Sequence, residues 1–126
     1  MDSGKRPLSP HLGVYRWQWT MAYSILHRFT GIALSLGAVL LVVWLTALAA
    51  GPAAFATVQA LLLSPFGILV MIGFTLAFFY HLLNGLRHLV WDSGCWLDLR
   101  GAERSGHAAA GGAVLLTALL WLFIGL

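Results

Sequence analysis

The sequence predicts an all-α integral membrane protein with three transmembrane helices. Of its 126 residues, 60% are hydrophobic and 9% are charged, whereas about a quarter of a soluble domain is charged. No Lys, Arg, Asp or Glu occurs from Phe29 to Leu86 or from Ser105 to the C-terminus. A soluble fold of this length could not bury so much apolar surface, so we expect one membrane domain over residues 1–126.

The three predicted spans follow from the lengths of the apolar runs. Crossing the hydrocarbon core takes about 20 residues of helix, and three runs qualify, at about 23–50, 63–91 and 107–126. We expect a short connection over 53–60 and a polar one over 91–106. The "ALA" at 47–49 resembles a signal-peptide cleavage site, but the apolar run before it exceeds the usual 7–15 residues or so, which favours a retained span.

The basic residues predict the orientation of these spans. All seven fall beside the N-terminal segment or the 91–106 connection, and none lies in 51–60. The positive-inside rule therefore places the N-terminus and the 91–106 loop in the cytoplasm and the C-terminus in the periplasm. This grouping beside apolar runs explains the net charge of +3 without nucleic acid as a partner. Cys95 is the only cysteine, which excludes an intrachain disulfide or a thiolate metal cluster.

Two histidines on the second span predict a cofactor site. His81 and His88 are seven residues apart, so they share a helix face and stand about 10 Å apart along the axis. That separation excludes both as ligands of one haem iron. Asp92 marks the inner interface, and His81 lies roughly 16 Å deeper, close to the bilayer centre. A charged imidazole would be costly at that depth, whereas a neutral, iron-bound one would not. Gly85, on the same face, would let a flat ring approach.

The surroundings of His81 leave two interpretations open. Arg87 and His88 lie near the inner interface, where cationic partners of haem propionates belong, and Asn84 could donate a hydrogen bond nearby. Asp92 would cap the helix or pair with Arg87. No other histidine of this chain is expected at the depth of His81, so a second axial ligand would come from another subunit or be absent. Alternatively, His81 simply hydrogen-bonds a neighbouring helix.

A second polar stripe begins the first span. In "SILHRFTG", residues 24–31, Ser24, His27, Arg28 and Gly31 lie at i, i+3, i+4 and i+7. The stripe is expected at about the level of His88, and its side chains suit a quinone headgroup or a haem propionate. Arg28 could also be a plain topology signal that reaches water. Residues 1–22 are too polar to span the membrane and are expected to lie along its inner surface or to dock on a soluble partner.

Three motifs together resemble a known family. The segments "RPLSPHLGVYRW", "SILHRFTGIALSLG" and "YHLLNGLRHLVWD" occur in this order. They closely resemble the cytochrome b membrane-anchor subunit of succinate dehydrogenase (respiratory complex II). Of the two anchor subunits of that complex, they resemble the larger one. The likeness covers nearly the whole chain, so that residues 1–126 would form a single membrane-anchor domain.

The resemblance implies a role for each motif. His81 falls on the axial ligand of haem b, and the smaller anchor subunit would supply the opposite ligand. Ser24 and Arg28 fall on the ubiquinone site, and His27 and Arg28 near the haem propionates. Gly85 and His88 would complete the haem pocket. The "RPLSPH" segment would pack on the iron–sulfur subunit, through Pro7, Ser9, Pro10 and His11.

The activity that the resemblance implies belongs to the complex. Succinate would be oxidised on a flavoprotein subunit, and electrons would pass through iron–sulfur centres to ubiquinone, so this chain is not catalytic alone. A bacterial plasma membrane is favoured over the mitochondrial inner membrane. One rival is the anchor of a fumarate reductase that uses menaquinone. Another is a structural membrane scaffold without haem, whose histidines and arginines serve only packing and topology. A transporter is disfavoured because the spans contain no intramembrane acid.

Overall fold

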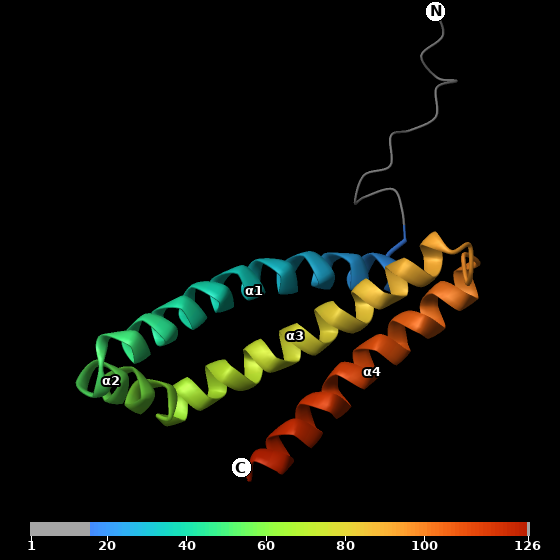
Figure 1. The fold of residues 1–126 in the computed structure, drawn as a ribbon. Coiled ribbons are helices and arrows are strands. Elements are labelled where there is room, and N and C mark those ends of the chain that lie inside the picture. Colours follow the sequence, from blue (N-terminus) through green and yellow to red (C-terminus); the bar gives the residue numbers. More distant parts are fainter. Residues whose placement is uncertain (1–15, 126) are drawn as a thin grey trace, which may run out of the picture.

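Three long helices make up most of the structure (Figure 1). The computed structural model describes residues 16–125, which contain α1 (Trp19–Ala50), α2 (Pro52–Leu62), α3 (Pro65–Asp92) and α4 (Leu99–Ile124). Within that range there is no strand. α1, α3 and α4 are each long and apolar enough to cross a membrane. The predicted fold class, all-α with three spans, is confirmed.

The two ends of the helix bundle differ in charge. The start of α1 and the α3–α4 connection lie at one end, and α2 and the C-terminal end of α4 lie at the other (Figure 1). The first end carries Arg16, Arg100 and Arg104, and we call it the basic end. This arrangement agrees with the sequence prediction that the N-terminus and the 91–106 segment share a side. Which side of the membrane they occupy stays a prediction.

The connection expected over 53–60 is instead a helix, α2. Pro52 occupies its first turn, where the fixed φ of proline favours a helix and its missing N–H costs nothing. Trp44 of α1 holds α2 against α1. Its indole Nε1 donates to Gln59 Oε1 at 3.1 Å, and its ring packs edge-on against that of Phe55, with centroids 5.7 Å apart. With 11 residues, α2 is about 16 Å long and too short to cross the membrane.

Two long helices begin earlier than the hydropathy predicted. α4 starts at Leu99 rather than at 107, and α1 at Trp19 rather than at 23. Asp98 caps α4, because its Oδ2 accepts a hydrogen bond from the N–H of Gly101 at 3.0 Å. The first turns of α4 are polar and therefore invisible to a search for apolar runs. The bounds of α3 agree with the predicted span at 63–91 to within two residues.

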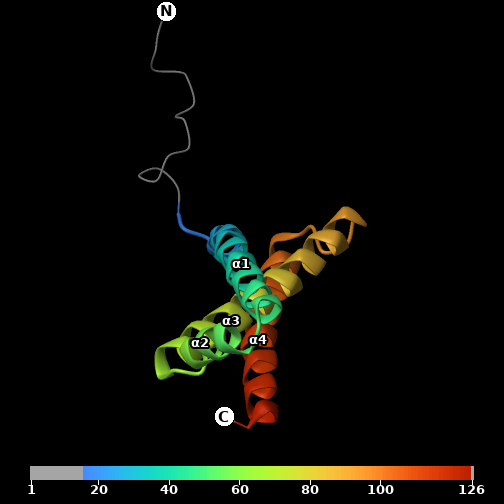
Figure 2. The same cartoon turned by 60° about the vertical axis from the view of Figure 1, so that its left-hand side comes forward.

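α3 packs against both α1 and α4, and α1 meets α4 near the basic end. Tyr23 of α1 is buried there: its hydroxyl hydrogen-bonds His107 Nδ1, and its backbone oxygen accepts from the Tyr80 hydroxyl at 3.0 Å. A Cβ on Gly106 would overlap the Tyr23 ring, so this crossing depends on a glycine. Away from this crossing α1 and α4 separate, and the C-terminal end of α4 lies apart from α2 in both views (Figure 2).

Candidate functional site: a histidine cluster between α1 and α3

Three histidines from α1 and α3 come together and form the candidate site. The rings of His27 and His81 stack almost in parallel, with centroids 4.0 Å apart and an interplanar angle of 12°. The ring of His88 lies 5.4 Å from that of His27. All three are half-buried. We call them the histidine cluster. The sequence predicted that His81 and His88 share a face, and the packing of α1 on α3 adds His27 to them directly.

The hydrogen bonds of His81 determine which ring nitrogen carries the proton. Its Nδ1 lies 3.2 Å from the backbone oxygen of His27 and 3.2 Å from Thr30 Oγ1. The Thr30 hydroxyl itself donates to the His27 oxygen at 2.9 Å. A carbonyl oxygen can only accept, so Nδ1 of His81 is the protonated nitrogen. The lone pair of the neutral ring is therefore on Nε2, which makes no hydrogen bond to any residue in 16–125.

Two glycines frame the His81 ring. A Cβ on Gly31 would lie 3.2 Å from His81 Cε1, so the ring rests directly against the α1 backbone. Gly85, one turn after His81 on α3, has no heavy atom within 4 Å of a Cβ position, its own helix backbone aside. Gly31 therefore seats the histidine, while Gly85 leaves an open strip on the helix face that His81 and His88 share. The sequence predicted such a strip at Gly85.

His27 contributes a polar atom that the described part of the chain leaves unpaired. Its Nδ1 is buried and has no hydrogen-bond partner among residues 16–125. Buried polar atoms in native proteins are nearly always paired. His27 is also stacked on the face of His81, and that contact does not obstruct Nε2, whose lone pair lies in the ring plane. This arrangement is suited to a group that approaches Nε2 edge-on and also offers an acceptor or donor to His27.

Ser24 and Arg28, the predicted quinone-binding pair, flank His27 on α1. Ser24 is half-buried and Arg28 is exposed. The structure places them next to the histidine cluster along the helix but gives neither side chain a hydrogen bond within residues 16–125. Pro7, Ser9, Pro10 and His11, the predicted docking residues, lie outside the described residues.

Sequence reasoning missed the role of Arg87, which points to α4 rather than to the histidine cluster. Its Nε donates to Ser105 Oγ at 2.9 Å, its Nη1 to Asn84 Oδ1 at 3.1 Å and its Nη2 to the Ala102 oxygen at 2.6 Å. Its guanidinium lies 3.9 Å from the centre of the Trp91 ring. We call Asn84, Arg87, Trp91 and Ser105 the arginine cluster.

The burial and the hydrogen bonds of the arginine cluster correct three expectations, those for Arg87, Asn84 and Asp92. Arg87 is 6% exposed and Asn84 1% exposed, so neither faces a cofactor beside His81. The hydrogen bonds of Arg87 go to α3 and α4 and not to Asp92, and the C-cap of α3 is Ser93. A signal was present in the sequence: Asn84, Arg87 and Trp91 repeat at i, i+3 and i+7 and so form a stripe of their own.

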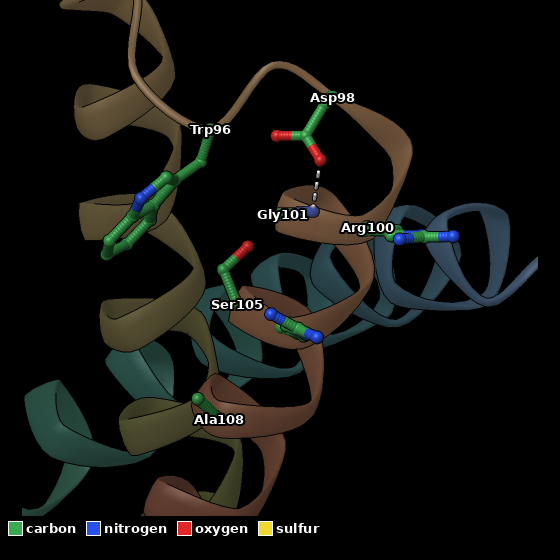
Figure 3. Close-up of a pocket in the computed structure, with 7 residues that line it drawn as sticks. Trp96, Asp98, Arg100, Gly101, Ser105 and Ala108 are labelled. Carbon is green, nitrogen blue, oxygen red and sulfur yellow. Dashed lines mark hydrogen bonds between the residues drawn. The ribbon is translucent and has the colours of Figure 1, made fainter.

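A separate cavity opens at the basic end (Figure 3). It measures about 560 Å³ and contains the Asp98 carboxylate that caps α4. None of its lining residues belongs to the histidine cluster; they are Trp96, Asp98, Arg100, Gly101, Arg104, Ser105 and Ala108. Ser105 links the wall of this cavity to Arg87.

The donor set of the histidine cluster fits a haem better than a bare metal ion. Within residues 16–125, no group of three or more His, Cys, Asp or Glu side chains could hold a metal ion. A haem iron needs only an axial ligand from the protein, and a neutral histidine is a common one. Metal-ligating histidines usually donate their other ring N–H to a carbonyl oxygen, as Nδ1 of His81 does to His27. The residues present therefore fit a haem.

The fold and the site define a multi-pass helical membrane protein with a histidine site between two of its spans. Residues 2–120 match the family of succinate dehydrogenase/fumarate reductase transmembrane subunits, and the chain belongs to that family.

Individual relatives agree over nearly the whole chain. The succinate dehydrogenase cytochrome b556 subunit of Paracoccus denitrificans is 43% identical over 119 residues, covering 94% of this chain and 92% of the relative. That of Rickettsia conorii is 36% identical over 118 residues, with the same coverage. The mitochondrial cytochrome b560 subunit of Bos taurus is 44% identical over 109 residues, covering 82% of this chain and 62% of the relative. These bacterial and mitochondrial relatives and the three spans fit the predicted multi-pass inner-membrane protein.

Proposed function

We propose that this chain is the larger membrane-anchor subunit of a succinate:ubiquinone oxidoreductase and supplies one axial ligand of haem b. The observation that carries the proposal is the tautomer of His81. Its Nδ1–H is held by the His27 oxygen and Thr30, which leaves the lone pair of Nε2 for iron. A bound haem would supply a one-electron site. The smaller anchor subunit would provide the second axial ligand, because the His27 ring is stacked on His81 and His88 lies beside His27, so neither would reach the opposite face of the same haem.

The other residues of the cluster would hold the rest of the haem. Gly85 would let the macrocycle approach α3, where a side chain would otherwise intervene. His27 and His88, with Arg28, would meet the propionates near the basic end, and the unpaired Nδ1 of His27 would then gain a partner. Arg87 has no part in this pocket, because each of its three side-chain nitrogens donates a hydrogen bond elsewhere. Two of them donate to α4 and one donates to Asn84 on α3.

Ser24 and Arg28 would bind ubiquinone next to the haem. Both can donate to a carbonyl oxygen, and a cationic donor stabilises the negative charge that develops there on reduction. The complex would dock its iron–sulfur subunit on the segment with Pro7, Ser9, Pro10 and His11, with the flavoprotein subunit beyond. The fumarate reductase alternative shares this site, and the direction of turnover and the quinone that copurifies with the complex separate the two.

The haem proposal is tested by a dithionite-reduced minus oxidised visible spectrum of the detergent-purified complex. We expect a b-type α-band in wild type that is lost or shifted in His81→Ala, since the iron loses an axial ligand. His107→Ala is the matched control, because His107 belongs to α4 and contacts Tyr23 rather than the cluster. An intact wild-type complex without a haem band would contradict the proposal and favour the structural scaffold.

The quinone proposal is tested with Arg28→Ala. Removing a charged donor from a developing oxyanion typically costs about 10²-fold or more in rate. We expect succinate:ubiquinone reductase activity to fall by at least about tenfold, while succinate oxidation by an artificial acceptor that bypasses the quinone site is retained. Arg104→Ala, an exposed arginine at the same basic end, should leave both activities unchanged. Equal loss of both activities in Arg28→Ala would instead indicate a defect in assembly.

A further inference from the structure

Thr30 differs from the other threonines of this chain whose side chains make hydrogen bonds. Thr57, Thr75 and Thr117 each donate to the backbone oxygen four residues earlier, at 3.1, 2.8 and 2.7 Å. Such bonds are routine for threonine in helices and need no functional explanation. Thr30 donates instead to the oxygen of His27, three residues earlier, and its Oγ1 also contacts a side chain on another helix, His81 Nδ1 at 3.2 Å.

The directions of these bonds are determined by elementary chemistry. The Thr30 hydroxyl has one hydrogen, and the His27 oxygen, which can only accept, takes it. The oxygen of the hydroxyl therefore faces His81 as an acceptor. Nδ1–H of His81 is shared between this oxygen and the His27 oxygen, both at 3.2 Å. The three atoms form a closed triangle in which every hydrogen has an acceptor.

This triangle, together with two other contacts, holds the His81 ring at three places. The hydrogen bonds hold Nδ1, His27 stacks on one face at 4.0 Å, and Gly31 lies against the Cε1 edge. The Nε2 direction is then fixed by α1, although His81 belongs to α3. A second acceptor at Nδ1–H also makes the imidazole a stronger base, since it draws the proton further from the ring.

We propose that Thr30 is a positioning residue for the axial ligand, which orients His81 and tunes the basicity of its Nε2. This inference deepens the proposed haem function and rests on it. A more basic ligand favours ferric over ferrous iron. Loss of the Thr30 oxygen would therefore favour the ferrous form and raise the midpoint potential of the haem. Because the His27 oxygen remains as an acceptor, haem should still bind.

The test compares Thr30→Val and Thr30→Ser in the purified complex with a redox titration of the haem. Valine keeps the shape of threonine but offers no acceptor, while serine keeps the hydroxyl. Removing a hydrogen-bond partner of a metal-bound ligand typically costs about 10–100-fold in metal affinity or activity. Because Thr30→Val keeps one acceptor for His81, we expect its preference for ferric over ferrous iron to fall by up to about tenfold. That change corresponds to a rise in the midpoint potential of up to about 59 mV for a one-electron couple. Thr30→Ser should titrate like wild type.

Thr75→Val is the matched control, because Thr75 makes the same kind of backbone bond on α3 without contacting a histidine. It should titrate like wild type and show the same haem spectrum. Loss of haem in Thr30→Val with retention in Thr30→Ser would support the positioning role in a stronger form. An unchanged potential and spectrum in Thr30→Val would overturn it, as would equal changes in the valine and serine variants.

Failure of the underlying function is seen separately. If the wild-type complex has no haem band, the proposed haem function is contradicted, and the role of Thr30 is contradicted with it before any variant is compared. A wild-type complex with haem and a Thr30→Val variant identical to it overturns the role of Thr30 alone. The two results come from different samples and cannot be confused.

Discussion

α3 carries two polar clusters on neighbouring faces, and the chain treats them differently. Arg87 and His88 are consecutive, so their side chains leave the helix about 100° apart. Around Arg87, α4 supplies a hydroxyl and a carbonyl oxygen, and the arginine is 6% exposed. Around His88 and His81, α1 supplies a stacked ring and a carbonyl oxygen but leaves the histidines half-buried and His27 Nδ1 unpaired.

In our proposal, the difference is between a site that holds helices together and a site that binds a ligand. A cation inside the apolar part of a membrane protein is costly unless its donors are used, and this chain alone provides acceptors for Arg87. The histidine cluster has one nitrogen fixed as a donor and its neighbour Nε2 free, with an open strip at Gly85. The arginine cluster is not fully paired within residues 16–125 either, because Asn84 Nδ2 and Trp91 Nε1 are buried without a hydrogen-bond partner. What distinguishes the histidine cluster is a ring nitrogen with a free lone pair beside open space, which is suited to a ligand.

The largest effect on stability is expected from Arg87→Ala. The change removes three hydrogen bonds from a charged donor and leaves Asn84 Oδ1 buried without it. Such bonds contribute about 1.5–3 kcal/mol each, and relief of the desolvation of the cation offsets part of the loss. We expect a net cost of about 3 kcal/mol, seen as a low yield of assembled complex with a lower unfolding temperature, while haem in the assembled fraction stays at the wild-type ratio.

Arg104→Ala is the control for this experiment. Arg104 is an exposed arginine of α4, and surface substitutions usually change stability by less than about 0.5 kcal/mol. Selective loss of haem from stable Arg87→Ala complex would contradict the comparison, because it would place Arg87 in the haem pocket after all.

The sequence predicted the elements that depend on composition and periodicity. Three spans follow from the absence of charge over long runs, and the shared face of His81 and His88 follows from helical spacing. α2 was missed because its run is too short to span, and the start of α4 because its first turns are polar. In both places hydropathy detects only the segments apolar enough to span a membrane, and it misses helical residues that are polar or too few to span.

The site could be predicted only in part, since periodicity gives the face of a residue but not its neighbour. Asn84 and Arg87 were assigned to the haem side because nothing in the sequence says which helix covers them. Thr30 was not singled out, because its importance arises only when α1 and α3 approach within hydrogen-bonding distance. The tautomer of His81 depends on that same approach.

The smallest effect on stability, and the sharpest test of the comparison, is expected from Gly85→Ala. Its Cβ would meet no atom within 4 Å outside its own helix backbone, so this chain accommodates it. Alanine in place of glycine inside a helix is worth about 0.5–1 kcal/mol of stability. The same methyl group would intrude on a ring packed against α3, and such overpacking costs about 1–3 kcal/mol. We therefore expect a slightly more stable chain with a lower haem-to-protein ratio.

Gly73→Ala separates these two consequences, because Gly73 lies on the same helix and its Cβ would also meet nothing within 4 Å. It should show the same gain in thermal stability with haem unchanged. The measurement is the pyridine haemochrome content per complex, beside the unfolding temperature, for both variants. At a cost of 1 kcal/mol or more, haem should be held at least about fivefold more weakly in Gly85→Ala. Identical haem content in the two variants would mean that the open strip at Gly85 faces lipid or another subunit, and His81 would then have to bind its haem from a different side of α3.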